Sequence, residues 1–261
     1  MKDNKNSVGN IFKVAFVICL VCALVVSTAA VSLRSLQEEN RNAFRQQNVL
    51  QAAGLYEQGM NVSEAFQRIE RRVVEFDTGE YVDLPEGFDI VRAARDPANS
   101  RPMGGDDPAG IGRRANYGEV FLARDDRDEL THVILPVHGY GLWSTMYGFL
   151  ALEPDLNTIA GISFFEHGET PGLGGEIENP RWQEGWIGTQ LRDDEGSLAF
   201  RVSRGRTPEG APDADYRIDG LSGATITANG VENMVRFWAG EQGYGPYLAS
   251  LDQRVETGEV N

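Results

Sequence analysis

Glycines and hydroxyl side chains that could hold a cofactor gather in three short stretches of the chain. We call residues 137–147 the first glycine segment, 166–175 the second and 219–225 the third. Glycine leaves backbone N–H groups uncovered, so a planar ring or a phosphate can approach the main chain closely. The third segment leads into a helical pattern, which places Ser222 and Thr225 beside a helix N-terminus that attracts anions. Binding of a phosphate-bearing cofactor is one interpretation, and simple turns with a Ser or Thr cap are the other.

Other side chains suited to metal or redox chemistry are scarce. Cys19 and Cys22 both lie in an apolar N-terminal stretch, which argues against a disulfide framework, a thiolate zinc site and a Cys-ligated iron–sulfur cluster. The three histidines, His132, His138 and His167, are too few for a histidine-rich metal or haem site. We therefore predict no metal site.

A hydrolase is a second class of function that the same residues suggest. His138 or His167 would be the base, Ser222 or Thr225 the nucleophile and Glu169 the group that orients the base. However, the chain contains no G-x-S-x-G elbow, and no spacing places a base beside a hydroxyl. This class is the weaker one, and we assign no catalytic residue.

Composition limits the class of protein further. The chain has 261 residues, of which 41% are hydrophobic, so it can bury a core and is not disordered throughout. It has 39 acidic against 24 basic residues, a formal net charge of −15. Because phosphate binding requires a basic face, this balance argues against a nucleic-acid partner.

The chain opens with an apolar run that could cross a membrane. Residues 14–33 carry no charge, and about 20 residues at a rise of 1.5 Å span a hydrocarbon core. The alternative is a cleaved signal peptide, since residues 27–30 are small, but apolar cores of signal peptides have only about 7–15 residues. All three lysines precede the run, so residues 1–13 are predicted to be cytoplasmic and residues 34–261 to lie outside. That outer part has 21 arginines and 38 acids, a net charge of −17.

The outer part has the pattern of one α+β domain. The anchor helix is predicted to continue through residues 34–60 and to stop at Gly59, followed by a second helix that Ser63 caps and that includes Ile69 and Val73. The other expected elements are two short strands in 73–82, a long loop at 95–116, apolar strand-like runs at 119–123, 130–137, 146–152 and 158–165, a strand pair near 186–202 and a helix over 227–238.

The three glycine segments resemble those of the C subunit of the sodium-translocating NADH:quinone oxidoreductase, a six-subunit bacterial respiratory complex. Asp219-x-x-Ser-Gly-Ala-Thr225 matches the acceptor motif for covalent flavinylation. The stretches GLWSTMYGFLAL (141–152) and FFEHGETPGLGGEIENPRW (164–182) match this C subunit more closely than the paralogous G subunit of the Rnf complex, which stays the alternative. The resemblance covers the anchor and most of 119–240 and is thinner across 85–116.

The resemblance implies a single N-terminal transmembrane helix followed by one FMN-binding α+β domain. It implies that a flavin transferase uses FAD to join the FMN phosphate to the Thr225 hydroxyl as a phosphoester. The residues implied to recognise the transferase are Asp219, Ser222, Gly223, Ala224 and Thr225. The residues implied to contact the flavin are Leu142, Trp143, Glu169, Thr170, Gly172, Leu173, Gly174, Ser222, Gly223, Ala224 and Thr227.

Several of these residues also have structural interpretations. Trp143 could be a core residue, and Asp219 could be a turn-forming Asx residue. Glu169 either tunes the flavin potential or forms a surface ion pair, while Thr227 caps the helix or reaches the phosphate.

The resemblance also implies a function and partners. The protein would lie in the bacterial inner membrane with its main domain in the periplasm and would carry electrons from an intramembrane iron centre to the FMN of the B subunit. Its partners would be the other five subunits, notably the B, D and E subunits, in a complex that oxidises NADH, reduces ubiquinone and exports Na⁺. We expect contact with them through residues 34–60 and the glycine segments. The remaining alternative is a scaffold subunit without flavin.

Overall fold

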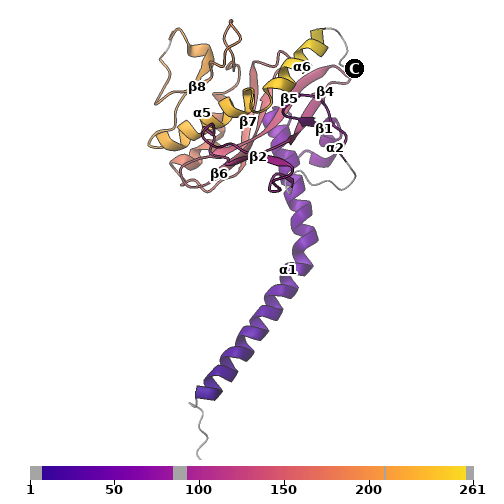
Figure 1. The fold of residues 1–261 in the computed structure, drawn as a ribbon, viewed down its shortest axis with the longest axis vertical. Helices are drawn as coiled ribbons and strands as arrows, with labels where there is room; N and C mark the ends of the chain where they lie inside the picture. Colours follow the sequence, from indigo (N-terminus) through magenta and orange to yellow (C-terminus); the bar gives the residue numbers. More distant parts are fainter. Residues whose placement is uncertain (1–7, 85–92, 209, 257–261) are drawn as a thin grey trace, which may run out of the picture. The chain divides into compact units, whose positions relative to one another are not determined.

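The structure is a computed structural model that describes residues 8–84, 93–208 and 210–256 (Figure 1). The chain divides into two compact units, Met1–Phe44 and Arg45–Asn261. Lys2 and Lys5, on which the predicted orientation partly depends, lie outside the described residues.

Helix α1 (Val8–Ala52) contains the whole uncharged run predicted as the anchor. Among the described residues it is the one helix that is long and apolar enough to cross a membrane. The helix stops at Ala52, so the predicted end at Gly59 is wrong. Gly54 follows it with φ +66°, a left-handed conformation that glycine adopts without strain, and the N–H of Leu55 bonds back to the carbonyl of Leu50 at 2.8 Å.

The second unit is built on a five-stranded antiparallel sheet with strand order β1-β4-β5-β6-β7 (Figure 1). Its strands are β1 (Ile69–Glu75), β4 (Tyr117–Arg124), β5 (Leu130–Tyr140), β6 (Thr145–Leu152) and β7 (Ile159–Glu166). The last four strands confirm the four predicted apolar runs. They form a meander, because each one pairs with the next along the chain.

Both faces of this sheet are covered, which is why its strands are apolar at successive positions rather than at every second one. In β4, for example, Val120 and Leu122 belong to one core cluster, whereas Phe121 and Ala123 belong to the other. Because successive side chains of a strand point to opposite faces of the sheet, they belong alternately to the two clusters.

Helix α5 (Thr225–Ala239) covers one face of the sheet, together with α6 (Gly245–Glu256). Val231, Met234 and Val235 of α5 are buried in the same cluster as the strands, which confirms the predicted helix over 227–238. No helix was predicted at α6, because its pattern is short and partly polar.

The opposite face is covered by the end of α1. Val49, Leu50 and Ala52 are buried against Phe121 and Phe149 of the sheet. At the same end of the helix, Arg45 forms an ion pair with the buried carboxylate of Glu119, which Arg71 also contacts through its Nη2 at 2.5 Å. Residues 45–53 are therefore part of the core of the domain and not a spacer that leads to it.

Two other predicted elements differ from the structure. The second helix, α2 (Val62–Phe66), has five residues and is capped by Asn61 rather than Ser63. Ile69 and Val73 belong to strand β1, because these β-branched residues pair with β4 and its long-range pairing outweighs the local helical spacing. The strand pair expected near 186–202 is wrong, since that stretch contains only isolated bridges, of Arg192 with Leu198 and of Gln190 with Thr158, and the two-residue strand β8 (Arg201–Val202).

The remaining elements are short. Residues 73–82 contain the end of β1 and an isolated bridge between Val74 and Tyr81. The range 95–116 includes a small ribbon of β2 and β3. The bounds are β2 (Ser100–Pro102), β3 (Arg113–Ala115), η1 (Gly174–Glu178), α4 (Pro180–Glu184), η2 (Ala214–Tyr216) and β9 (Arg217–Ile218), which pairs in parallel with β8.

Helix α5 lies close to the end of β5 because of a glycine. A Cβ added at Gly230 would lie 2.6 Å from the carbonyl oxygen of Tyr140 and 3.2 Å from the Cα of Gly141. We expect Gly230→Ala to lower the free energy of unfolding by about 1–2 kcal/mol, because displacing packed backbone outweighs the gain of about 1 kcal/mol in helix propensity. Urea unfolding followed by tryptophan fluorescence measures the change. Asn229→Ala, at the exposed neighbouring position of the same helix, is the control and should leave stability unchanged or slightly higher.

Candidate functional site

The three glycine segments lie at one end of the sheet. Tyr140 pairs with Thr145 and Tyr147 pairs with Glu166, so the β5–β6 turn and the end of β7 are neighbours. The hydroxyl of Ser144 joins the first two segments by accepting a hydrogen bond from the N–H of Gly168 at 2.5 Å. The third segment runs from β9 into the N-terminus of α5, which packs against the same end.

Glu169 of the second segment contacts the first segment and the first turn of α5. Its Oε1 accepts hydrogen bonds from the N–H groups of Trp143 at 2.9 Å, Leu142 at 3.1 Å and Ser144 at 3.4 Å. Its Oε2 accepts the hydroxyl of Thr227, in the first turn of α5, at 2.5 Å. The residue is only 4% exposed, and no ion pair to it occurs among the described residues.

Burial alone would raise the pKa of the Glu169 carboxyl. The hydrogen bonds from Thr227 and from the backbone N–H groups of residues 142–144 outweigh burial and hold that pKa below its ordinary value. Glu169 is therefore an internal carboxylate, and the surface ion pair considered as one interpretation does not form. Thr227 is buried as well, and its hydroxyl donates to this carboxylate rather than pointing outward.

Two glycines make room for this carboxylate. A Cβ at Gly141 would lie 2.6 Å from Glu169 Oε1, and a Cβ at Gly174 would lie 2.7 Å from Oε2 and 2.5 Å from Thr227 Oγ1. A larger residue at either position would push the side chains apart. Gly141 belongs to the first glycine segment but is not among the residues implied to contact the flavin. Its place next to Leu142 in a turn is the signal that could have pointed to it.

Thr225 is the first residue of α5 and is exposed. Its hydroxyl makes no hydrogen bond within the part of the chain that the structure describes. The N-cap is Ala224, which has no side-chain acceptor for the first N–H groups of the helix, so the Ser or Thr cap considered from the sequence is absent. This 15-residue helix thus begins with uncapped donors beside a free hydroxyl.

Exposed apolar side chains lie on the first and second glycine segments and beside Thr225 in the chain. Trp143 is 64% exposed, Leu142 41% and Leu173 45%, so Trp143 is not a core residue. Ile226, next to Thr225, is exposed too. Exposed aromatic and aliphatic side chains that gather at one place commonly mark a binding surface.

The other predicted site residues occupy turns of the second and third segments. Gly172 and Gly223 have φ of +76° and +72°, and a Cβ at Gly223 would lie 3.1 Å from Leu173, so these two segments touch. The carbonyl of Thr170 accepts the N–H of Gly175 at 2.9 Å and closes the second segment. Ser222 is exposed, one turn before the helix begins.

Asp219 holds a neighbouring loop. Its Oδ1 accepts the N–H of Thr207 at 2.7 Å, and its Oδ2 lies 3.9 Å from Nε of Arg206. Its carbonyl accepts the indole N–H of Trp182 at 2.8 Å. The Oδ1 of Asp219 thus bonds to a residue twelve positions earlier in the chain, so Asp219 does not form the local Asx turn that was one of its interpretations.

The histidines do not form a hydrolytic site. His138 lies between the rings of Tyr147 and Trp238, and burial lowers its pKa to about 4. His167 accepts the N–H of Glu169 on its Nδ1 at 3.1 Å. Among the described residues neither imidazole hydrogen-bonds to a serine or threonine hydroxyl, and no group of three His, Cys, Asp or Glu side chains could hold a metal ion.

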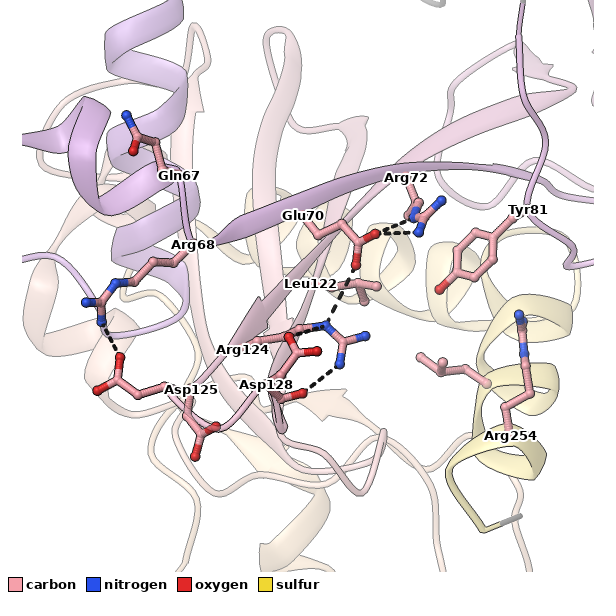
Figure 2. Close-up of a pocket in the computed structure, with 12 residues that line it drawn as sticks. Gln67, Arg68, Glu70, Arg72, Tyr81, Leu122, Arg124, Asp125, Asp128 and Arg254 are labelled. Atoms are coloured by element: carbon pink, nitrogen blue, oxygen red, sulfur yellow. Dashed lines mark hydrogen bonds and ion pairs between the residues drawn. The ribbon is translucent and has the colours of Figure 1, made fainter. Parts of the chain in front are cut away.

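A cavity of about 680 Å³ lies elsewhere on the domain, between β1, the end of β4 and α6 (Figure 2). Its charged side chains pair with one another, as Arg72 does with Glu70 at 2.6 Å and Arg68 with Asp126 at 3.2 Å. None of its lining residues belongs to a glycine segment. Since its charges are already compensated, this cavity is not a candidate for the cofactor.

Comparison with known proteins agrees with the geometry. Residues 141–240 match the family model of the FMN-binding domain. The chain is 47% identical over 254 residues to the C subunit of the Na(+)-translocating NADH-quinone reductase of Yersinia pestis, covering 95% of this chain and 94% of that protein. It is 44% identical to the corresponding C subunit of Haemophilus ducreyi, covering 96% of each.

Solved structures support the same fold. The crystal structure of NqrC from Shewanella oneidensis superposes with a TM-score of 0.74 at 38% identity and covers 80% of this chain and 96% of its own. The C subunit of the Na(+)-translocating NADH-quinone reductase of Parabacteroides distasonis superposes with a TM-score of 0.63 at 28% identity, covering 83% of this chain and 96% of its own. The chain is an α+β protein with an N-terminal apolar helix and an FMN-binding domain, and it belongs to the family of the C subunit of the Na⁺-translocating NADH-quinone reductase, an oxidoreductase complex.

Proposed function

We propose that this chain carries FMN as a phosphoester on Thr225 and acts as an electron carrier in a sodium-pumping NADH:ubiquinone oxidoreductase. The single observation that supports the attachment most strongly is the exposed, unpaired hydroxyl of Thr225 at the start of α5, where Ala224 leaves the helix N-terminus uncapped. A phosphate on this oxygen would accept the free N–H groups and would cap the helix.

The surrounding residues fit a flavin. Leu142 and Trp143 of the first segment and Leu173 of the second are exposed apolar side chains that would pack on the isoalloxazine ring. Gly172, whose Cβ position is open, would let the ring approach the backbone. The same segments contain Thr170, Gly174, Ser222 and Ala224. Glu169 and Thr227 are buried and hydrogen-bond to each other.

A tether explains how the cofactor is retained. FMN facing an open compartment would otherwise be lost by dilution, and attachment through the phosphate leaves the ring free for the redox chemistry that flavin supplies. We infer that a flavin transferase recognises the third segment, from Asp219 to Thr225, with Asp219 presenting this segment by holding residues 206 and 207.

The place in the complex follows from the family. The flavin would take electrons from an iron centre in the membrane subunits and pass them to the FMN of the B subunit, while the complex reduces ubiquinone and exports Na⁺. The B, D and E subunits would be the nearest of five partner subunits. Helix α1 would be a single-pass anchor in the bacterial inner membrane, with its N-terminus in the cytoplasm and the second unit in the periplasm.

Two alternative functions are less well supported. A flavoprotein of the Rnf G type is disfavoured because relatives that span nearly the whole chain at 41–47% identity are named as C subunits of the Na⁺-translocating enzyme. A scaffold subunit without flavin would have no need of an unpaired hydroxyl at a helix N-terminus or of exposed apolar side chains on the glycine segments.

Attached flavin is directly visible. We expect the chain, produced in cells that contain the flavin transferase, to give a fluorescent band at its own mass on a denaturing gel under ultraviolet light. Tandem mass spectrometry of the tryptic peptide 218–236 should place the mass of FMN on Thr225 rather than on Ser222 or Thr227. A dark band from such cells would instead support the scaffold function.

A further inference from the structure

The carboxylate of Glu169 has an unusual environment for a buried charge. It is surrounded by donors that carry no charge, namely the N–H groups of three consecutive residues, 142–144, and the hydroxyl of Thr227. No arginine, lysine or histidine forms an ion pair with it within the described ranges 8–84, 93–208 and 210–256. Successive backbone N–H groups that curve around one point form a concave site for an anion.

We propose that Glu169 is a positioning residue whose carboxylate fills the anion site of the first glycine segment. It thereby ties the first and second segments to the first turn of α5, into which the third segment leads, so that these parts form one cradle for the flavin. The inference rests on the proposed function only where it concerns the flavin. The contacts themselves join residues 142–144, residue 169 and the first turn of α5, three parts of the chain separated by 25 and 58 residues.

The chemistry explains why a carboxylate rather than an amide is needed. A carboxylate has only acceptors, and all four groups that face it are donors. A glutamine could keep its oxygen toward the N–H groups and donate its NH₂ to the Thr227 hydroxyl, which can also accept. Its neutral oxygen is nevertheless a weaker acceptor for the three N–H groups than a carboxylate oxygen. Gly141 and Gly174 enclose the same carboxylate, so that its donors cannot be replaced by water without opening the cradle.

The contacts of Glu169 also set its effect on the flavin. Leu142 and Trp143, whose N–H groups bond to the carboxylate, carry the exposed side chains that would pack on the ring. An uncompensated negative charge beneath the ring disfavours the addition of an electron and keeps the reduction potential low. Glu169 thus positions the apolar wall and adds one negative charge to the site.

Amide hydrogen exchange tests the cradle without any flavin. In the full-length chain carrying Thr225→Ala, we expect Glu169→Gln to speed exchange of the 142–144 amides by about tenfold or more, because hydrogen bonds to charged groups are stronger than those to neutral ones. Glu166→Gln is the matched control. It removes an exposed carboxylate three residues away that makes no side-chain hydrogen bond in the described part, and exchange should stay at the wild-type rate.

Thr227 offers a second pair of variants if Glu169→Gln fails to fold. Thr227→Val removes the hydroxyl that donates to Oε2 at 2.5 Å and should speed the same exchange by a smaller factor. Thr227→Ser keeps the hydroxyl and should restore the wild-type rate. Equal exchange rates of the 142–144 amides in the Thr227→Val and Thr227→Ser variants would overturn the proposal.

In the flavin-loaded chain, the midpoint potential of the flavin can be measured, and a purely structural role of Glu169 would leave this potential unchanged. We expect Glu169→Gln to keep the fluorescent band and to shift the flavin midpoint potential to a more positive value, whereas Glu166→Gln leaves it nearly unchanged. If Glu169→Gln matches Glu166→Gln in exchange and in potential, Glu169 does not hold the cradle. If the wild-type chain lacks the fluorescent band, the proposed function fails, and the exchange measurement still decides on Glu169.

Discussion

We expect that replacing Thr225 with alanine will remove all covalently bound flavin from the chain and abolish the fluorescent band on the denaturing gel. The reason is chemical, since a phosphoester needs the oxygen that alanine lacks. The fold should persist, because Thr225 is exposed and its hydroxyl makes no hydrogen bond in the described part of the chain. Circular dichroism of the variant should match that of the wild type, and NADH-driven quinone reduction by the assembled complex should fall to background.

Thr225→Ser is the matched control for this prediction. It keeps a hydroxyl at the same place at the start of α5, so some covalent flavin should remain. Ser222→Ala tests the second exposed hydroxyl of the third segment and should leave the modification on Thr225. A band that survives Thr225→Ala and vanishes in Ser222→Ala would show that the attachment site is wrong.

The second large effect concerns residues 45–53 at the end of α1. A soluble chain that starts at residue 45 should fold, whereas one that starts at residue 54 should be largely unfolded or aggregated. The shorter chain lacks Val49 and Leu50, which are almost fully buried against the sheet. Each such side chain contributes about 1.5–3 kcal/mol through burial, and a domain has only about 5–15 kcal/mol in all.

The shorter chain also loses Arg45, one of the two cationic partners of Glu119. Thermal unfolding followed by circular dichroism compares the two chains, both of which lack the apolar run, so any difference comes from 45–53 alone. Leu50→Ala in the longer chain removes part of the same buried contact and should lower the free energy of unfolding by about 2–5 kcal/mol. Equal stability of the two truncated chains would show that the α1 end is not part of the core.

Elements that depend on local pattern could be read from the sequence. Residues 14–33 lack charge over the length that a membrane helix needs, and they lie within α1. The apolar runs 119–123, 130–137, 146–152 and 158–165 became β4 to β7. Helix α5 also followed its apolar spacing. In each case the information lies in neighbouring residues, and tertiary contacts strengthen what the local pattern already favours.

Elements whose identity depends on a distant partner could not be read in this way. Ile69 and Val73 have helical spacing but form a strand because β4 lies beside them. The sequence predicts the end of α1 only as a continuation of the anchor helix, and Val49 and Leu50 become core because the sheet offers them an apolar face. Composition alone gives no sign of either contact.

The candidate site shows the same division. Its glycine segments and the exposed Thr225 were evident from residue types and from the resemblance they carry, because glycine and hydroxyl chemistry is a property of the residue itself. The role of Glu169 was not, since it remained open between a tuning charge and a surface ion pair. Only the fold brings residues 142–144 and Thr227 around its carboxylate, and a buried charge is defined by the donors that surround it and not by its place in the chain.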